Sequence, residues 1–468
     1  MKEIEQILQQ DSIADITSSL KEKSVVVPSW SDLVKDYEPE FHDIVTDKSS
    51  RKDKILEGGK VEVAARIAIG LEKLLVRRFT DFTFAIDVKR IYYTNNDIQK
   101  EIASAIEKIY TTAHINSENI KRGIAYYASC EIFTLWYTRK NKNNLYGFPC
   151  DYKLKCKTYN PMSHTKLYPL FDDKDDMIAM SYEYKKKVKD EWVTYFETFT
   201  ADKHFVWSNS ENDDWKSVIN NEEVTIEKIP GAYLSRQRPV YDELSILRKE
   251  LEYTISRNSD IIAYNAAPVL KVVGQLVGNV EKDETRRVYR LTDGGDVSYV
   301  SWSQSIESLK YHIDTILRLY FMQAQMPDVS FDNLKSLGNI GYDARKTLLT
   351  DAHLRIGEES GPWVEFFERE CNVIKAFLKK MNTRWSEDDI DAVRVEHVIT
   401  PFVQEDELNE IKKWQLANGN KPLISHRESV VAANLTEDPA KTYEEIGKEQ
   451  LAQSTMEQAG LIDTINAL

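Results

Sequence analysis

Glycine and proline are scarce in this sequence, which has 17 Gly and 13 Pro among its 468 residues. Together they reach only about half of their usual share of roughly 12%. This scarcity excludes a collagen-like or linker-rich chain and argues against a turn-dense β-sandwich, because such proteins need many residues of both types. It favours long, uninterrupted helices.

Disulfide frameworks, membrane spans and a basic excess are also missing. The four cysteines are too few and too scattered for a disulfide framework, so we expect free thiols at Cys130, Cys150, Cys156 and Cys371. No run approaches the roughly 18 apolar residues of a membrane span, and the polar N-terminal residues lack a secretory signal core. We therefore expect a soluble protein of a reducing compartment, with no membrane partner.

The charge balance is acidic, with 62 Lys and Arg against 76 Asp and Glu and a formal charge of −14. This balance argues against a protein that grips a phosphate backbone over its whole surface, although a local basic patch remains possible. With 42% hydrophobic and 10% aromatic residues, the chain can bury a sizeable core. Its length predicts two to four folding units.

The first half of the sequence has a mixed α and β pattern. Apolar residues at helical spacing predict helices within 1–22 and over roughly 60–78, 95–114 and 117–129. Alternating apolar residues predict strands at 79–88, 131–137, 151–159, 177–184, 192–198, 204–207 and 224–229. Together these segments predict one α+β domain.

A small β insert between two long helices is the most informative stretch. Pro239 lies in the first turn of a predicted helix over 239–266, and Pro268 ends it. Strands are predicted at 269–273, 288–291 and 297–302, and a second helix over about 304–325 must return antiparallel to the first.

A loop over 327–341 separates this stretch from a long helical pattern over 342–381. The Gly361-Pro362 pair predicts a kink in that helix, because proline removes a backbone donor and clashes with the preceding turn. A short strand at 392–400 and a polar helical tail over 404–468 complete the chain.

Motifs for catalysis or metal binding are absent from the sequence. The eight histidines are dispersed, and the common phosphate-binding, zinc-protease and serine-hydrolase motifs do not occur. The acidic residues at 172–176 lack the glycine and distal glutamate of a calcium loop, which favours a solvated loop. We expect no catalytic residue, no metal and no cofactor.

Two sets of charged residues accompany the helix–β–helix stretch. The second helix carries charges of both signs at spacings of three and four residues, and this charged file consists of Glu307, Lys310, Asp314 and Arg318. An ordinary amphipathic helix would show the same pattern, but in a ring of copies such a file would line the inner wall. The tip of the insert is of mixed charge, which suits either a docking site or a solvated hairpin; its basic residues are Lys282, Arg286, Arg287 and Arg290.

The order of these elements resembles that of the portal proteins of tailed bacteriophages, of the siphophage type. Four stretches carry the resemblance: IPGAYLSRQRPVYDELSILRKELEYTISRNSDIIAYNAAPVLKVVG (229–274), DGGDVSYVSW (293–302), MPDVSFDNLKSLGNIGYDARKTL (326–348) and ISHRESVVAANLTEDPAKTYEEIGKEQ (424–450). The N-terminal half is similar only in its general pattern, a helical start followed by β-rich segments. In the loop after Pro327, Gly338, Asn339 and Gly341 stand where the family usually has a Ser-Gly pair.

The resemblance implies an α+β portal-type subunit and a division of the chain. The expected parts are an N-terminal helical arm (1–50), an α/β wing (51–238), a first stem helix (239–266), a small β-containing clip (267–303), a second stem helix (304–326), a tunnel loop (327–341), a long kinked wing helix with a strand (342–403) and a helical crown (404–468).

The resemblance also implies a function without enzymatic activity. Portal proteins form homo-oligomeric rings, typically of twelve subunits, at one capsid vertex of the virion after assembly in the host cytoplasm. Double-stranded DNA passes through the ring during packaging and ejection, and the tunnel loop would meet it through weak, non-specific contacts of Asn333, Lys335, Ser336, Gly338 and Asn339. The implied partners are the terminase motor, the major capsid and scaffolding proteins, and neck or adaptor proteins, with the clip as a docking site.

Two other functions stay open from the sequence. One is a different virion protein, such as a neck adaptor or scaffold. The other is a hydrolase or transferase whose site lies in residues 60–238, which would need carboxylates or histidines converging in a pocket.

Overall fold

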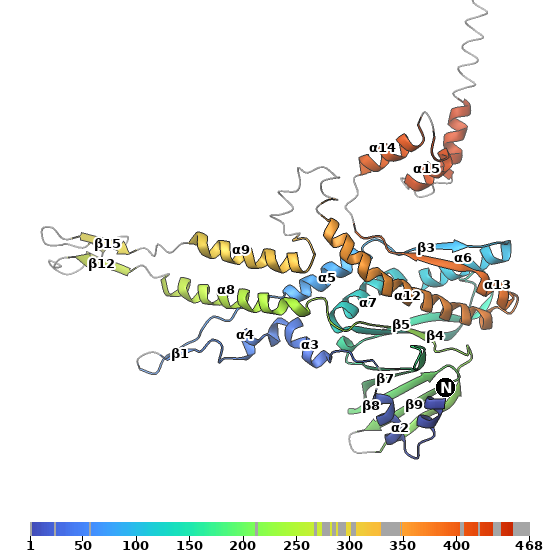
Figure 1. Cartoon of the computed structure of the whole chain (residues 1–468), viewed down its shortest axis with the longest axis horizontal. Coiled ribbons are helices and arrows are strands. Elements are labelled where there is room, and N and C mark those ends of the chain that lie inside the picture. Colours follow the sequence, from blue (N-terminus) through green and yellow to red (C-terminus); the bar gives the residue numbers. More distant parts are fainter. Residues whose placement is uncertain are drawn as a thin grey trace, which may run out of the picture. The chain divides into compact units, whose positions relative to one another are not determined.

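A computed structural model describes residues 2–22, 25–55, 58–210, 214–265, 269–273, 281–282, 287–288, 296–300, 306–328, 347, 349–402, 407–419, 422–433 and 441–452. The chain divides into two compact units, one over residues 1–334 and 349–402 and a smaller one over 335–348 and 403–468. Helices and sheets are mixed, so the predicted α+β class is confirmed (Figure 1).

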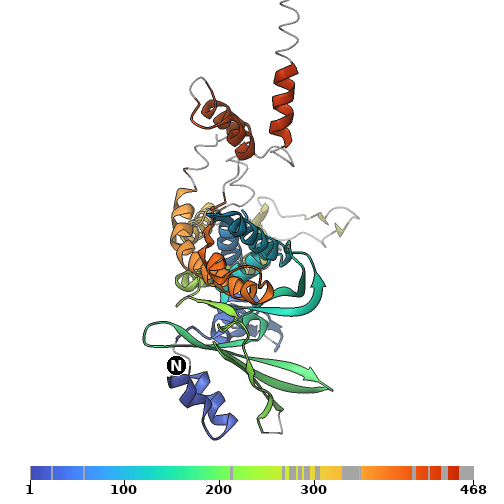
Figure 2. The same cartoon turned by 90° about the vertical axis from the view of Figure 1, so that its right-hand side faces the viewer.

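A five-stranded antiparallel sheet forms one layer of the larger unit, in the order β10-β9-β8-β7-β6. Its strands are β6 (Lys166–Phe171), β7 (Met177–Val188), β8 (Glu191–Thr200), β9 (Lys203–Ser210) and β10 (Lys216–Glu223). The N-terminal helices α1 (Lys2–Leu8) and α2 (Ile13–Lys21) cover it, as Figure 2 shows. Ile16 and Leu20 of α2 pack with Phe196 and Trp207 of the sheet in a core of their own, since alternate strand residues point to the covered face.

A second antiparallel sheet, in the order β11-β4-β5, lies among the larger helices. Its strands are β4 (Glu131–Asn143), β5 (Cys150–Tyr159) and β11 (Gly231–Ser235). The helices of this region are α5 (Leu71–Phe84), α6 (Asp97–Thr112), α7 (Ile115–Ser129) and α12 (Thr350–Met381). A further pair, β3 (Lys89–Tyr93) and β16 (Arg394–Val398), runs antiparallel, and α13 (Glu387–Ala392) precedes β16.

Local sequence signals explain where these helices form. Asn96 caps α6, because its side chain accepts a hydrogen bond from the Gln99 amide, and the buried residues of α6 then recur at helical spacing. In α7, a glycine lets α5 approach closely: a Cβ on Gly123 would lie 2.9 Å from Thr80 Cγ2 and 3.0 Å from Phe84 Cδ2. The α5–α7 contact therefore depends on a residue without a side chain.

The helix expected over 60–78 forms only from Leu71 onward, and the strand expected over 79–88 is wrong. One helix, α5, begins at Leu71 and continues through Phe84. Five of the six residues from Phe79 to Phe84 are buried, with Asp81 exposed, so apolar residues there imitate the two-residue period of a strand.

The strand expected over 224–229 is also wrong, because this segment connects β10 to β11. The Glu227 amide bonds to the Val224 carbonyl, which makes a turn. Val224, Ile226 and Ile229 alternate because they are buried in the core beneath that turn.

The long helical pattern over 342–381 is found as α12, whose described part begins at Thr350. Pro362 lies inside this helix without ending it. The residues after it, Trp363, Phe366 and Phe367, are buried in a core shared with α5 and α7, and this packing holds the helix together across the proline.

The smaller unit is helical where it is described, with α14 (Glu407–Ala417), α15 (His426–Ala433) and a helix over 441–452. Ile411, Trp414, Val430 and Ile446 line a hollow of about 410 Å³ among them. In the larger unit, all four cysteines are free thiols as predicted, with Cys156 only partly buried. Within the described residues, no helix is long and apolar enough to cross a membrane.

Candidate functional site

The helix–β–helix stretch folds as two helices that lie side by side (Figure 1). The first helix starts later than predicted, since the 3-10 turn η3 (Asp242–Leu244) precedes α8 (Ser245–Asn265). The second is α9 (Ile306–Gln323). Between them in sequence, β12 (Val269–Val273) pairs antiparallel with β15 (Asp296–Val300), as the two outer predicted strands require.

One face of α9 packs against the body of the larger unit, where Ile316 and Tyr320 join the same core as Leu251 of α8. The charged file lies on the side left open: Glu307, Lys310, Asp314 and Arg318 are all exposed. In the described part of the chain, none of these four side chains forms an ion pair. The file is therefore exposed to solvent, and no described side chain neutralises its charges.

Only part of the predicted docking and tunnel residues can be placed. Lys282 on β13 (Glu281–Lys282) stands directly opposite Arg287 on β14 (Arg287–Val288) in an antiparallel pair. Arg286 and Arg290 fall outside the described residues, and so do all five tunnel-loop residues, which are Asn333, Lys335, Ser336, Gly338 and Asn339.

A buried network of charges anchors α8, and the sequence did not reveal it. Arg248, which is fully buried, donates from Nε to Glu72 Oε1 at 2.5 Å, from Nη1 to Glu252 Oε2 at 2.9 Å and from Nη2 to Asp36 Oδ1 at 2.6 Å. His42 extends the network, with Nδ1 2.6 Å from Glu252 Oε1 and Nε2 2.9 Å from the Asp36 carbonyl oxygen. Three segments, α3 (Trp30–Tyr37), α5 and α8, thus meet at one guanidinium.

A second set of contacts joins α8 to an extended segment, residues 64–69, which we call the strap. Three strap amides donate to side chains of α8: Ala65 to Asp260 Oδ1 at 2.8 Å, Ile67 to Ser256 Oγ at 2.9 Å, and Ile69 to Glu252 Oε1 at 2.8 Å. Arg51 also pairs with Asp260.

The strap and the helix fit because their repeats match. Alternate residues of an extended chain are about 6.6 Å apart, and residues four apart on a helix rise about 6 Å. The two segments run antiparallel, and each turn of α8 supplies one acceptor. Backbone N–H groups that no sheet satisfies are bonded in this way.

The carboxyl group of Glu72 is only partly satisfied by hydrogen bonds. Its Oε1 accepts from Arg248, but Oε2 is buried and has no partner among the described residues. Burial raises the pKa of Glu72 to about 7, even though the Arg248 charge opposes the shift. This buried site therefore gains or loses a proton near neutral pH.

A signal for the contacts between the strap and α8 was present in the sequence. Arg248, Glu252, Ser256 and Asp260 recur every four residues along a helix that otherwise carries an apolar stripe. A polar stripe of this kind is usually a solvated face. Nothing local distinguishes it from one that binds a segment almost 200 residues earlier in the chain.

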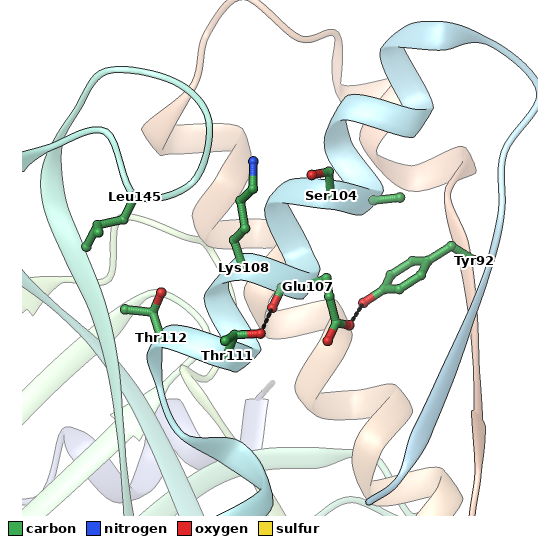
Figure 3. Close-up of a pocket in the computed structure, with 8 residues that line it drawn as sticks. Tyr92, Ser104, Glu107, Lys108, Thr111, Thr112 and Leu145 are labelled. Atoms are coloured by element: carbon green, nitrogen blue, oxygen red, sulfur yellow. Dashed lines mark hydrogen bonds between the residues drawn. The ribbon is translucent and has the colours of Figure 1, made fainter. Parts of the chain in front are cut away.

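A surface pocket between α6 and the β4–β5 turn has several polar side chains in its lining (Figure 3). It has a volume of about 420 Å³ and is lined by Tyr92, Ala103, Ser104, Glu107, Lys108, Thr111, Thr112 and Leu145. Its carboxylate is engaged, because Glu107 accepts two hydrogen bonds from Arg90 and one from Tyr92, and the Arg90 bonds lower the pKa of Glu107. The pocket therefore supplies no free acid–base pair.

Comparison with known proteins identifies the class of the chain. A family model described as "Phage portal protein, SPP1 Gp6-like" matches residues 30–456, so the class is that of phage portal proteins. Within this class the chain belongs to the SPP1 Gp6-like family. Members of that family are structural proteins, in agreement with the lack of a catalytic motif. No curated protein matches the sequence significantly.

Solved structures of phage-like particles are distantly similar. The neck of an empty gene transfer agent (GTA) particle, computed with C6 symmetry, matches 86% of this chain and 95% of its own chain at 10% identity, with a TM-score of 0.42. The neck of a native GTA particle, computed with C12 symmetry, matches 90% of this chain and 98% of its own at 9% identity, with a TM-score of 0.41. The virion of a native GTA particle matches 90% and 97% at 9% identity, with a TM-score of 0.37.

Proposed function

We propose that the protein forms a ring of twelve copies at one vertex of a phage capsid and conducts double-stranded DNA through the centre of the ring. Membership of a portal family carries this proposal. It is supported by the pair of long helices, α8 and α9, of which one is anchored by the buried network and the other leaves its charged file open.

In this proposal α8 and α9 are the stem, β12 to β15 belong to the clip, and residues 327–341 are the tunnel loop. The clip docks the terminase motor and later the neck or adaptor proteins, and Lys282 and Arg287 are paired positions of its strands β13 and β14. The wing contacts the major capsid and scaffolding proteins, and the crown comprises residues 404–468. The ring is assembled in the host cytoplasm and remains in the virion.

The charge of the chain suits a conduit. Twelve copies at −14 each give a ring of −168 before counterions. A wall that alternates in sign, as the file Glu307, Lys310, Asp314 and Arg318 does, offers no continuous row of cations to the phosphates. DNA can then move past the wall without being held at each step.

The test of this proposal is the mass and shape of the purified particle. Twelve chains of 54.2 kDa give a ring of about 650 kDa, which mass photometry and negative-stain imaging at micromolar concentration would detect. Glu307→Lys with Asp314→Lys should leave the ring intact if the file faces the lumen, as should the matched control Glu365→Lys on the exposed side of α12. A protein that stays monomeric under these conditions contradicts the proposal.

The tunnel-loop assignment has a separate test. Replacing residues 327–341 by a short Gly-Ser linker should leave rings intact and block DNA packaging or retention, because the flanking helices fold without the loop. Filled, infectious particles made with this variant would show that the loop does not contact the moving DNA.

A further inference from the structure

The β4–β5 hairpin carries a concentration of positive charge in an acidic chain. Residues 138–157 contain a single carboxylate, Asp151, and six cations, which gives the segment a net charge of +5 in a chain of −14; the cations are Arg139, Lys140, Lys142, Lys153, Lys155 and Lys157. No part of the stem, clip or tunnel-loop assignment uses these residues.

The strand register places four of the six cations on one face. Arg139 stands directly opposite Lys153, Tyr137 opposite Lys155, and Leu135 opposite Lys157. Because side chains alternate along a strand, Arg139, Lys153, Lys155 and Lys157 point to the same side of the sheet. The other side holds Trp136 and Leu154, which are buried in the core. We call the four cations the basic face.

Folding alone does not favour this arrangement. Like charges directly opposite on neighbouring strands destabilise a sheet, and no cation of the basic face is paired with a carboxylate in the described part of the chain. The carboxylates across the adjoining hollow are engaged elsewhere, since Glu197 and Glu222 both bond to His204, at 2.9 and 3.2 Å. Glu223 also lines that hollow, but the four cations of the basic face outnumber this single remaining carboxylate.

We propose that the basic face binds the phosphate backbone of double-stranded DNA, outside the channel and without reading its sequence. Lys153, Lys155 and Lys157 lie at intervals of about 6.7 Å along one straight strand, so the row spans about 13 Å. Phosphates rise by about 3.4 Å per nucleotide along one DNA strand, so the row covers about four of them. The Lys157 ammonium also rests 4.4 Å from the centre of the Tyr159 ring, which limits its motion.

Surface chemistry favours DNA over an acidic protein as the partner. Protein interfaces have an apolar centre surrounded by polar groups, whereas interfaces with DNA are polar and strongly basic. The exposed apolar residues of the hairpin are Leu145 in the turn and Tyr152, which pairs with Lys140 on the opposite side of the sheet. The basic face itself has no exposed apolar anchor among its described residues.

The number of phosphate contacts sets a measurable salt dependence. Four contacts predict that log K falls with log salt concentration at a slope of about −3.6, and removing two cations should reduce the slope to about −1.8. Binding should not depend on the base sequence of the DNA.

The experiment uses the full-length protein and a relaxed, covalently closed DNA circle. A closed circle cannot thread a closed ring, so binding to it reports a surface outside the channel. Wild-type protein should bind the circle at low salt with the slope given above, and Arg139→Gln with Lys153→Gln should lose about half of that slope. Arg139→Lys with Lys153→Arg should behave as wild type, because charge and not shape is required.

Matched controls are Lys100→Gln with Lys121→Gln, which remove two cations of about 67% exposure on α6 and α7 and should leave the slope unchanged. Failure of the wild-type protein to bind the circle, or an equal loss in the control, overturns the proposal. Equally tight binding of poly-glutamate, with the same loss in the hairpin variant, would assign the face to an acidic protein instead. Mass photometry of each variant keeps this result separate from ring formation, because the basic face does not require a ring.

Discussion

Replacing Arg248 by methionine is the most direct test of the buried network that anchors α8. The substitution removes the guanidinium that pairs with Glu72, Glu252 and Asp36 but keeps a long apolar stem in its place. Glu72 and Glu252 are almost completely buried, so two carboxyl groups would lose their cation without access to water. Removing one partner of a buried ion pair usually costs about 3–5 kcal/mol.

The strap gives this prediction a local readout, because its Ile69 amide bonds to Glu252. If Arg248→Met weakens the anchorage by about 3–5 kcal/mol, amide hydrogen exchange of a peptide covering residues 64–69 should accelerate by about two to three and a half orders of magnitude. A global melting curve of the same variant checks that the remaining fold persists.

Two further variants separate charge pairing from simple loss of packing. Adding Glu72→Met to Arg248→Met should recover part of the loss, because an apolar pair of similar volume replaces an orphaned carboxyl group. Arg369→Met, which removes an exposed ion pair with Glu365, should cost less than about 1 kcal/mol. Exchange in Arg248→Met within fivefold of wild type would refute the view that the network holds α8 in place.

Two more predictions concern the same unit. Burial raises the pKa of Glu72 to about 7 from its ordinary value of 4.5, so the folded state holds this proton more tightly than the unfolded chain does. The stability that this proton contributes is therefore fully present below about pH 4.5 and is lost as the pH rises through 7. Wild-type protein should lose about 2–3 kcal/mol relative to Glu72→Gln between pH 5 and pH 8 in urea denaturation, and parallel curves for the two proteins would contradict the assignment. Gly123→Ala should destabilise the fold by about 1–3 kcal/mol despite the better helix propensity of alanine, because the new methyl group would contact Thr80 and Phe84 at about 3 Å. An unchanged melting temperature would show that α5 and α7 can separate at little cost.

Local pattern predicted much of the fold. Helices α6 and α7 and strands β5 and β8 lie within two residues of their expected positions, because each has a clear period. Strands β4 and β7 begin where expected and extend further. The order of α8, β12, β15 and α9 was likewise predicted, although α8 begins at Ser245, six residues after Pro239.

In both errors the buried residues follow the surrounding core and do not show the period of the element they belong to. From Phe79 to Phe84 every residue but Asp81 is buried, so the apolar residues no longer mark a narrow face of the helix. In residues 224–229 a turn lies on the core with only Val224, Ile226 and Ile229 buried, so its alternating pattern follows the core beneath it instead of the hydrogen bonds of a sheet.

The candidate site was only partly predictable for a different reason. The charged file could be found because its residues share one helix. Arg248 and Asp36, by contrast, are 212 residues apart in sequence, and a contact at that distance leaves no local period. Predicting the basic face requires the register of β4 against β5, since Arg139 and Lys153 become neighbours only when the strands pair.

The hydrogen bonds between the strap and α8 also have a consequence for synthesis on the ribosome. The strap amides of Ala65, Ile67 and Ile69 are made almost 200 residues before the last of their acceptors, Asp260. At the usual 5–20 residues per second, that interval lasts about 10–40 s. During this time the strap amides of the nascent chain have no α8 acceptors. A chaperone, or a transient non-native pairing, can therefore bind them before α8 emerges.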